Sequence, residues 1–391
     1  MALQEYESII YRCFRCGYCK LPSDYGDYNC PIYARFRLET CFPGGILWLM
    51  RAWWKNEIRW TDRLAKILFS CTTCSNCVEE CVMSFKTDIL NMITAGKSDM
   101  VEMGSVPAKV KGFLENITRY GNPYGESREK RDMWLEGTDI EQYKGQEYLY
   151  YVGCVGSYDT RAKEVTKSLG KLLLKSGLDF GVLGKEENCD GNEVRGLGEE
   201  SLFEAMADDN IKQFRDSGVK KIVTLSPHSY NAMHKYYSQP DGDFEVLHYT
   251  QVVKSLIYDK KLDVTKGLTA KVTYHDPCFL GRWNTEYEAP REILGAIPGI
   301  ELVEMERNKS NAFCCGGGGG NFYIDSFGSS EYVPARIRVR EALSTGADIL
   351  AVACPICLTM LDDAVKVEGI EDRLKVMDIS EIVASVCLQE G

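Results

Sequence analysis

Residues 312–320 read AFCCGGGGG, in which two adjacent cysteines, Cys314 and Cys315, precede five glycines. Glycine has no Cβ atom and reaches positive φ without strain, so this run lets the backbone fold closely over a neighbouring group. Two adjacent thiols can both face that group. What the group is, and which fold holds it, follows from the place of this stretch in an internal repeat.

Two copies of one segment follow each other after residue 146. SGVKKIVTLSPHSYNAM (217–233) in the first copy aligns with TGADILAVACPICLTM (345–360) in the second. The cysteine positions align as well, at offsets of 124 to 128 residues, through these pairs: Cys154 with Cys278, Cys189 with Cys314, Ser226 with Cys354, and Ser229 with Cys357. The sequence therefore predicts two related lobes packed around a pseudo-twofold axis.

Short buried-strand patterns alternate with amphipathic helical patterns in both copies. The predicted strands are EYLYYVG (147–153), KKIVTLS (220–226), KVTYHD (271–276) and ADILAVA (347–353). Helical stretches such as 160–177 and 331–346 lie between them, which is typical of parallel α/β units. Each cysteine group follows a predicted strand, where open α/β sheets gather their ligand sites.

The second copy is complete in cysteine, whereas the first is not. Five thiols of the second copy are expected to converge on one crevice: Cys278, Cys314, Cys315, Cys354 and Cys357. Five is one too many for a simple cube or a tetrahedral zinc. In the first copy Asp190, Ser226 and Ser229 replace three of the cysteines. We expect that lobe to serve packing and docking and to hold no such cluster; zinc held with His228 is the alternative.

Two tight cysteine runs occupy the N-terminal part of the chain. CFRCGYC gives Cys13, Cys16 and Cys19, followed by Cys30 and Pro31, and CTTCSNCVEEC gives Cys71, Cys74, Cys77 and Cys81. In two-cluster ferredoxins the fourth cysteine of each run binds the other cluster. The spacing therefore predicts one cubane [4Fe-4S] cluster on Cys13, Cys16, Cys19 and Cys81, and a second on Cys71, Cys74, Cys77 and Cys30.

Both runs depart from the ferredoxin pattern. Ten residues separate Cys19 from Cys30, and Val82 stands where a proline would follow Cys81. Cys41 competes with Cys30 as the eighth ligand, although Pro31 favours Cys30. A pair of zinc knuckles is the alternative, but such knuckles prefer two C-x₂-C pairs to two triplets.

The text C-x₃₅-C-C-G-x₃₇-C-x₂-C, duplicated behind a two-cluster ferredoxin module, resembles the ferredoxin-fused catalytic subunit of heterodisulfide reductase and the wider CCG-domain family. The resemblance implies that the five cysteines of the second copy hold a noncubane [4Fe-4S] cluster, at which a disulfide is reduced or formed. Gly316 and the glycines after it would bring backbone amides close to this cluster. A nucleotide loop is disfavoured because no GK[ST] follows.

Composition excludes several classes of protein. The 391 residues carry a formal charge of −11, so no basic face for nucleic acid is expected. No apolar run is long enough for a transmembrane helix, and the polar N-terminus lacks a signal-peptide layout. Seventeen cysteines without a secretion signal point to metal binding in a reducing cytoplasm.

These patterns divide the chain into four parts. We expect a two-cluster ferredoxin-type domain at 1–95, a linker at 96–145, a degenerate CCG lobe at 146–260 and a complete CCG lobe at 261–391. The apolar stretch 42–60 is expected to be a helix that packs on the module or a partner, with an interfacial membrane helix as the alternative.

Three histidines stand near the predicted sites or strand ends. His275 precedes Cys278 by three residues and either donates a proton to a leaving thiolate or hydrogen-bonds the backbone at the turn; both interpretations remain open. His248 ends a strand, which is typical of a helix-capping or core histidine. His234 is expected at the surface, and Cys41 and Cys387 are expected to be buried apolar residues.

We expect an iron–sulfur electron-transfer subunit of a larger redox complex, which passes electrons through two cubanes to or from the noncubane cluster. The alternative is a catalytic subunit that reduces or forms a disulfide or heterodisulfide at that cluster; a zinc-bound scaffold is a third class. Expected partners are flavoprotein, hydrogenase-like or cytochrome b type subunits, with a thiol or disulfide as possible substrate. Peripheral membrane association would come through such a partner.

Overall fold

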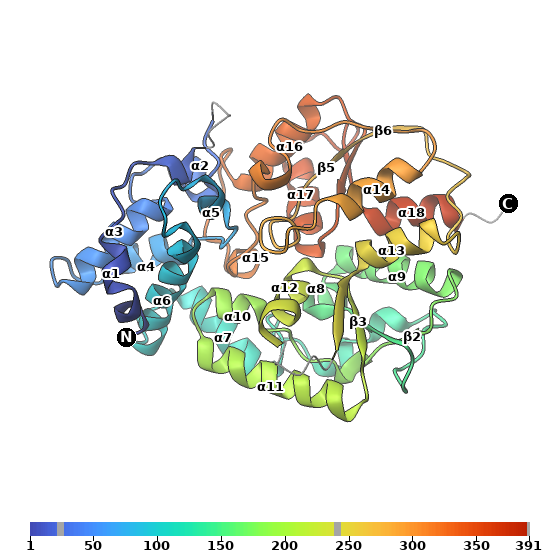
Figure 1. Cartoon of the computed structure of the whole chain (residues 1–391), viewed down its shortest axis with the longest axis horizontal. Coiled ribbons are helices and arrows are strands. Elements are labelled where there is room, and N and C mark those ends of the chain that lie inside the picture. The colour runs from blue at the N-terminus through green and yellow to red at the C-terminus, as the bar shows by residue number, and fades with distance from the viewer. Residues whose placement is uncertain (22–26, 238–243, 389–391) are drawn as a thin grey trace.

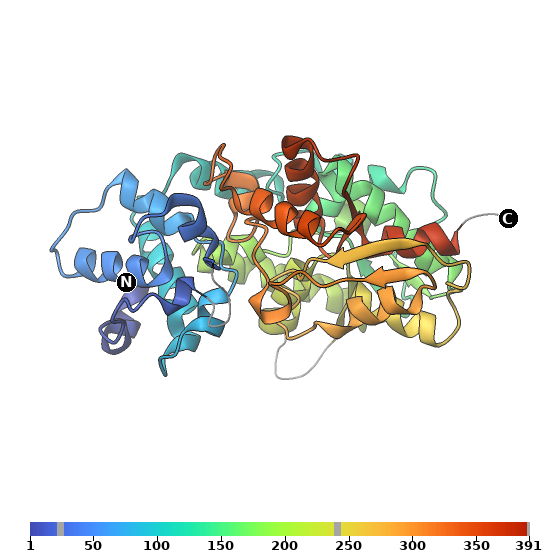
Figure 2. The same cartoon turned by 90° about the horizontal axis from the view of Figure 1, so that it is seen from above.

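The computed structural model describes residues 1–21, 27–237 and 244–388. A helical N-terminal module precedes two α/β lobes, each with its own four-stranded sheet (Figure 1). Seen from above, the module lies at one end of the long axis and the lobes at the other (Figure 2). The predicted fold class, a helical ferredoxin-type module followed by two repeated α/β lobes, is confirmed.

Short helices joined by cysteine-bearing loops build the N-terminal module. They are α1 (Glu7–Ile10), α2 (Pro31–Phe36), α3 (Pro43–Trp54), α4 (Asp62–Phe69), α5 (Asn76–Glu80) and α6 (Ile89–Glu102). Proline opens α2 and α3, where its missing N–H costs no hydrogen bond. Helix α3 buries Ile46, Leu47 and Met50 and packs on α6, so the helical part of the apolar stretch 42–60 packs inside the module, while residues 55–59 are exposed.

The stretch 96–145, expected to be a linker, is largely ordered. Helix α6 continues across residue 95, and α7 (Ala108–Tyr120) follows it. Val110, Phe113 and Ile117 recur at helical spacing and are buried, which accounts for this helix. Further on, Arg131 is buried in the first lobe. The predicted domain boundaries themselves stay a prediction.

The first lobe is a parallel sheet in the order β2-β1-β3-β4. Its strands are β1 (Tyr148–Tyr151), β2 (Phe180–Gly181), β3 (Lys221–Thr224) and β4 (Glu245–His248). Its helices are α8 (Gly153–Tyr158), α9 (Thr160–Lys175), α10 (Asn192–Gly196), α11 (Glu200–Asp216), α12 (Pro227–Ala232) and α13 (Tyr249–Tyr258). The central strands β1 and β3 are the two that the sequence predicts here.

The second lobe repeats this topology in the order β6-β5-β7-β8, again parallel. Its strands are β5 (Ala270–Tyr274), β6 (Ile300–Leu302), β7 (Ile349–Val352) and β8 (Lys375–Asp378). Its helices are α14 (Glu288–Ala296), α15 (Asn321–Ile324), α16 (Pro334–Ser344), α17 (Pro355–Glu368) and α18 (Ile379–Cys387). The sequence predicts β5 and β7, whereas edge strand β6 is short and only half-buried, so its pattern is weak.

Equivalent helices of the two lobes pack on each other in a reciprocal way. Helix α9 packs on α18, and their counterparts α14 and α13 pack on each other, between the two sheets (Figure 1). Arg161 on α9 forms a bidentate ion pair with Glu381 on α18, at 2.6 and 2.7 Å. The Tyr249 hydroxyl donates to Asp378 across the same interface, at 2.7 Å. This exchange of equivalent contacts is what a pseudo-twofold arrangement requires.

A membrane-spanning helix is not found among the residues that the structure describes, since none of their helices combines the length and apolarity needed to cross a bilayer.

Candidate metal centres

Four N-terminal cysteines line one small pocket. Cys13 and Cys16 lie in the loop after α1, Cys19 lies in the following 3₁₀ turn, and Cys81 ends α5. Gly17 has φ of +91°, which turns the loop between Cys16 and Cys19. Cys16 is exposed, so this pocket lies near solvent. The sequence predicts these four residues as ligands of one cluster, and the structure brings them together.

The other four predicted cubane ligands line a second pocket, which Cys19 also borders. Cys71 and Cys74 come from the loop before α5, Cys77 lies in the first turn of α5, and Cys30 stands before Pro31 at the start of α2. All four are buried. The competing residue Cys41 does not line this pocket; it lies beside Thr40 in the wall of another cavity.

Buried sulfur makes up the candidate donor set of the second pocket. Its polar lining consists of hydroxyl and amide side chains such as Thr72, Ser75 and Asn76, without a carboxylate. Burial raises the pKa of the Cys71 and Cys77 thiols, so they hold their protons unless a cation is bound. Soft sulfur ligands in this number fit an iron–sulfur cluster and do not fit Mg²⁺ or Ca²⁺.

The five cysteines of the second lobe form a chain of side-chain contacts. Cys278 follows β5, Cys314 and Cys315 precede the glycine run, and Cys354 and Cys357 lie at the start of α17. The Sγ atoms of Cys315 and Cys357 are 3.3 Å apart. Cys314 contacts both Cys278 and Cys315, and Cys357 contacts Cys354. The structure therefore brings all five predicted residues to one buried place.

This site touches the second pocket of the N-terminal module. Cys74 packs with Cys278, Cys314 and Phe279 in one small buried cluster, beside Trp283. The guanidinium of Arg282 fixes the contact, since its Nε donates to the Cys74 carbonyl at 2.7 Å and its Nη1 donates to the Ala312 carbonyl at 2.6 Å. The two candidate sites are thus joined through side chains and backbone.

The glycine run fits into this contact. Gly316 has φ of +96°, and its N–H donates to the Cys314 sulfur at 3.3 Å. A Cβ atom on Gly318 would lie 2.5 Å from the Thr72 carbonyl oxygen, and one on Gly319 would lie 2.3 Å from that of Cys71. The glycines therefore let the backbone of this run lie close to the ferredoxin module as well as to the Cys314 sulfur of its own lobe.

His275 is buried beside Cys315 and Cys357, with one donor atom of each within 4.8 Å of the others. Its Nδ1 accepts a hydrogen bond from Arg338 Nε at 3.1 Å, so the ring proton is on Nε2. Burial and the charge of Arg338 lower the pKa of His275 to about 3. The imidazole is therefore a neutral N–H donor near pH 7. Its hydrogen-bond partner at the turn is the Arg338 side chain and not the backbone.

The other histidines match their predicted surroundings. His248 ends β4 and caps α13: Thr250 N–H donates to its Nδ1 at 3.4 Å, and Gln251 accepts from its N–H at 2.9 Å. His234 is exposed. Cys41 is buried, while Cys387 is half-buried.

His228 contacts the complete lobe, which the sequence did not predict, since the sequence suggested this residue only as an alternative zinc ligand of its own lobe. It belongs to the degenerate lobe, yet its ring hydrogen-bonds Cys354 of the complete lobe and pairs with Glu193 at 2.6 Å. Although burial opposes ionisation, the hydrogen bonds from Cys357 and His228 lower the pKa of the Cys354 thiol to about 5. The only sign of this contact in the sequence lies in the repeat. When SPHS (226–229) is aligned with CPIC (354–357), the polar residue His228 takes the place of the apolar residue Ile356.

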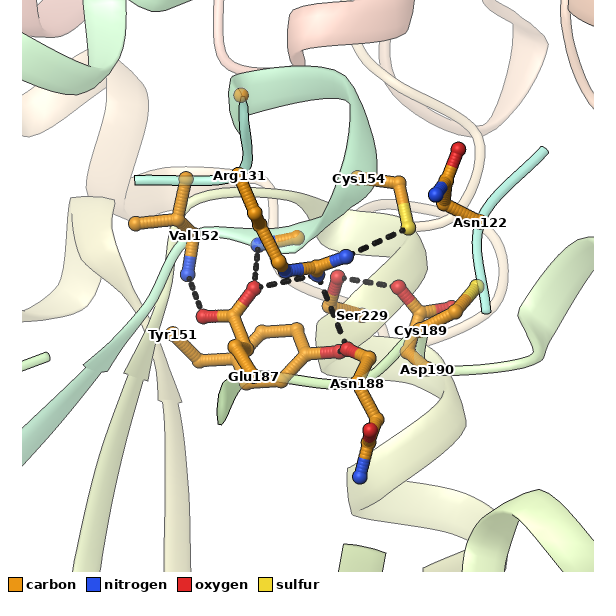
Figure 3. Close-up of polar contacts among 12 residues, drawn as sticks. Asn122, Arg131, Tyr151, Val152, Cys154, Glu187, Asn188, Cys189, Asp190 and Ser229 are labelled. Carbon is orange, nitrogen blue, oxygen red and sulfur yellow. Dashed lines mark hydrogen bonds and ion pairs between the residues drawn. The ribbon is translucent and has the colours of Figure 1, made fainter. Parts of the chain in front are cut away.

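The equivalent place in the degenerate lobe is filled by polar side chains (Figure 3). The Arg131 guanidinium lies against the sulfur of Cys154 at 3.5 Å and forms a buried ion pair with Glu187 at 2.7 Å. Ser229, which replaces a cysteine, donates to Asp190, which replaces another, at 2.8 Å. Cys154 and Cys189 remain in contact with each other.

Two family patterns match the chain. The 4Fe-4S dicluster domain matches residues 9–85, and the CCG cysteine-rich domain matches twice, at residues 148–234 and 272–362. The two CCG matches coincide with the two lobes. The resemblance stated from the sequence is thereby confirmed.

Several known proteins are similar over about four fifths of the chain. A probable iron-sulfur-binding oxidoreductase, FadF, of Bacillus subtilis is 38% identical over 82% of this chain and 46% of its own length. The EtfAB:quinone oxidoreductase of Syntrophomonas wolfei is 36% identical over 82% and 46%. A subunit of the dihydromethanophenazine:CoB–CoM heterodisulfide reductase of Methanosarcina barkeri is 32% identical over 80% of this chain and 76% of its own length. The chain thus spans about half the length of the first two relatives.

Proposed function

The chain belongs to the heterodisulfide reductase-like family of proteins that join a dicluster module to CCG domains, and from this premise we propose that it is an iron–sulfur electron-transfer subunit of a larger redox complex. The observation that carries the proposal is the buried contact of Cys74 with Cys278 and Cys314. It joins a candidate cluster site of the module to that of the second lobe.

We assign the ligands as follows. One cubane cluster is held by Cys13, Cys16, Cys19 and Cys81, and a second by Cys71, Cys74, Cys77 and Cys30. A noncubane [4Fe-4S] cluster is held by Cys278, Cys314, Cys315, Cys354 and Cys357. The shared pockets and the contacts of the five thiols support this assignment. Pro31 supports it too, since it orients Cys30 at the start of α2. When bound, these clusters would supply one-electron transfer along the chain.

Side chains around the second-lobe site hold the neighbouring loops in place, direct hydrogen-bond donors into the site and exclude water from it. Arg282 holds the Cys74 loop against the segment before Cys314. Phe279 stacks on Trp283 at 5.8 Å between ring centroids and covers the contact from one side. His275 directs an otherwise unpartnered Nε2–H into the buried interior, and the Gly316 amide donates to Cys314. Both donors favour negative charge on sulfur.

The proposed partner is another redox subunit that meets the first pocket. Cys16 is exposed there, and the apolar side chains of Phe14 and Val82 are 72% and 68% exposed beside it. Exposed apolar side chains next to a redox site suit a transient protein interface. A flavoprotein, hydrogenase-like or cytochrome b type subunit is proposed, and a reducing cytoplasm is the proposed location, in keeping with the unpaired thiols.

Iron analysis of the anaerobically purified protein tests the cluster assignment. We expect about twelve irons per chain, four for each of three clusters. In Cys315→Ser the count should fall to about eight while both cubane signals persist in electron paramagnetic resonance spectra. Loss of all clusters together in this variant would contradict the assignment, as would a wild-type count near eight.

The disulfide-reductase alternative is favoured by the two histidines beside the five cysteines. His275 and His228 place ring nitrogens next to Cys315 and Cys354, where they could hold a thiolate product. Oxidation of the protein in the presence of candidate thiols decides between the functions. A thiol-dependent paramagnetic signal that disappears in Cys315→Ser would support the enzyme, and its absence with every thiol would leave electron transfer alone.

A further inference from the structure

A pocket of about 590 Å³ lies where the N-terminal module meets the second lobe. Its walls come from α2 and α4, from the start of α7, and from residues 324–328 after α15. Small-molecule sites usually enclose about 300–1,000 Å³. The pocket is therefore large enough for an organic ligand, and its lining residues differ from those of the two cysteine pockets of the N-terminal module.

The charged residues that line the pocket are mainly basic. Arg35, Arg63, Lys66 and Lys109 line it, against one carboxylate, Asp325, which lies 3.6 Å from Lys109. Arg63 and Lys66 share one face of α4 and are exposed. Among the described residues, no acidic side chain lies within ion-pair distance of these two. In a chain with a net charge of −11, this local excess of positive charge favours an anion.

The backbone at the start of α7 adds to this preference. Pro107 is the N-cap residue and supplies no side-chain acceptor, so the first N–H groups of the helix have no capping partner there. Pro107, Ala108 and Lys109 all line the pocket. N–H groups at a helix start and the helix dipole stabilise a negative group next to them. One part of the pocket wall thus suits a single anionic group.

The remainder of the wall is apolar and aromatic. Phe36 and Phe327 lie with ring centroids 6.1 Å apart, and Ile67, Phe69 and Ile324 extend this surface. Phe327 is also close to the CCG loop, since its ring lies 3.3 Å from the place of a Cβ on Gly316. Phe69 precedes the cluster ligand Cys71 by two residues. A molecule in the pocket would contact segments that carry two of the cysteine sites.

We propose that this pocket binds an amphipathic anion, an apolar chain or ring that carries one carboxylate, sulfonate or phosphate group. The anionic group lies against Arg63, Lys66 and the start of α7, and the apolar part lies between Phe36, Ile67 and Phe327. This binding site is additional to the proposed electron-transfer function and does not depend on it.

Calorimetric titration of the cluster-loaded full chain with decanoate, below its micelle concentration, tests the proposal. Decanoate should bind more tightly than uncharged decanol or cationic decylammonium, and its affinity should fall with added salt. Arg63→Glu combined with Lys66→Glu should weaken decanoate binding about tenfold, because two attractive charges become repulsive. Leu38→Gln, at a half-exposed position of the apolar wall, should weaken decanoate and decanol alike.

Lys171→Glu is the matched control, since Lys171 is an exposed lysine on α9 far from the pocket lining, and it should leave the affinity unchanged. Equal affinity for decanoate and decylammonium would overturn the proposal. So would an unchanged affinity in the Arg63/Lys66 double variant that keeps wild-type thermal stability. Binding to phosphatidylglycerol vesicles without binding of monomeric decanoate would likewise overturn it, since it would indicate a membrane surface and not a pocket.

Discussion

At the scale of single residues, the degenerate lobe contributes chemistry to the complete one. His228 lies in the α12 turn of the first lobe, where the second lobe has Ile356, and it hydrogen-bonds Cys354 across the interface. Glu193 anchors the other side of the ring and also accepts from the Gly320 N–H. The lobe that lacks three of the five cysteines therefore supports the site of its partner lobe.

Replacement of His228 by glutamine tests this support. Although burial opposes protonation, the pairing with Glu193 raises the pKa of His228, so its ring is a positively charged donor next to the Cys354 sulfur. Such a donor stabilises the reduced, more negative state of the proposed second-lobe cluster, so its loss should lower the reduction potential of that cluster by on the order of 50 mV. The potentials of the two proposed cubane clusters should stay unchanged. Potentiometric titration followed by electron paramagnetic resonance measures all three. His234→Gln, at an exposed position of the same lobe, is the control, and an equal shift in both variants would refute the role of His228.

At the scale of elements, the glycine run joins the second lobe to the module, and the caps of the last helices repeat from one lobe to the other. The glycine run passes so close to residues 71 and 72 that Gly318 and Gly319 leave no space for a side chain. In each lobe the edge strand that follows last in the chain ends in a capping box, His248 with Gln251 on α13 and Asp378 with Glu381 on α18. The repeat thus extends to the caps of its last helices.

Gly319→Ala should destabilise the protein more than Gly328→Ala. Both glycines have nearly the same φ, +60° and +57°, so both variants carry a backbone cost of about 1–2 kcal/mol. Only at Gly319 does the new Cβ meet a carbonyl, whereas Gly328 faces open space. The clash should add about 1–3 kcal/mol. Thermal unfolding of the two variants measures this difference, and equal midpoints would rule out the close approach.

Asp378 should make stability depend on pH. Burial raises the pKa of this carboxyl to about 7, while the unfolded chain loses the proton near pH 4. Between these values the folded state binds more protons than the unfolded state, so stability is lost as the pH rises. Between pH 4 and 8 the free energy of unfolding of the wild type should therefore fall by on the order of 2–4 kcal/mol more than that of Asp378→Asn. Thermal unfolding across that range, with exposed Asp372→Asn as control, checks it; parallel curves for wild type and Asp378→Asn would contradict it.

At the scale of the whole molecule, the three cysteine sites follow one another. Cys19 borders the first and second pockets, and Cys74 touches the second-lobe cysteines. The first pocket lies near solvent beside exposed Phe14 and Val82, while the last site is buried. This order gives the proposed electron path one accessible end.

A double variant, Phe14→Ser with Val82→Ser, tests that end. Loss of two exposed apolar side chains should slow reduction by a protein donor about tenfold or more while iron content and reduction by dithionite stay unchanged. Stopped-flow spectroscopy measures both rates. Val367→Ser, exposed on the second lobe, is the matched control. Slower dithionite reduction would mean that the first site itself is damaged, and this would remove the support for docking there.

Much of this arrangement could be predicted from the sequence. The four central strands, the position of Cys81 and Cys30 beside the opposite cysteine runs, and the convergence of the five later cysteines follow from spacing and repetition in the linear sequence. The contact of His228 with Cys354 and the engagement of Arg131 by Cys154 could not be predicted. Both contacts depend on how separate segments meet in space, and Arg131 lies in the stretch expected to be a linker.

The buried contact between Cys74 and the second lobe has a consequence for separating the module from the lobes. Arg282, Trp283 and Asn321 donate hydrogen bonds to the backbone carbonyls of residues 74, 73 and 70, so the second lobe covers the loop that carries Cys71 and Cys74. A fragment cut after residue 95 would expose that loop to water and dioxygen. The module therefore depends on the second lobe for the cover of its inner cysteines.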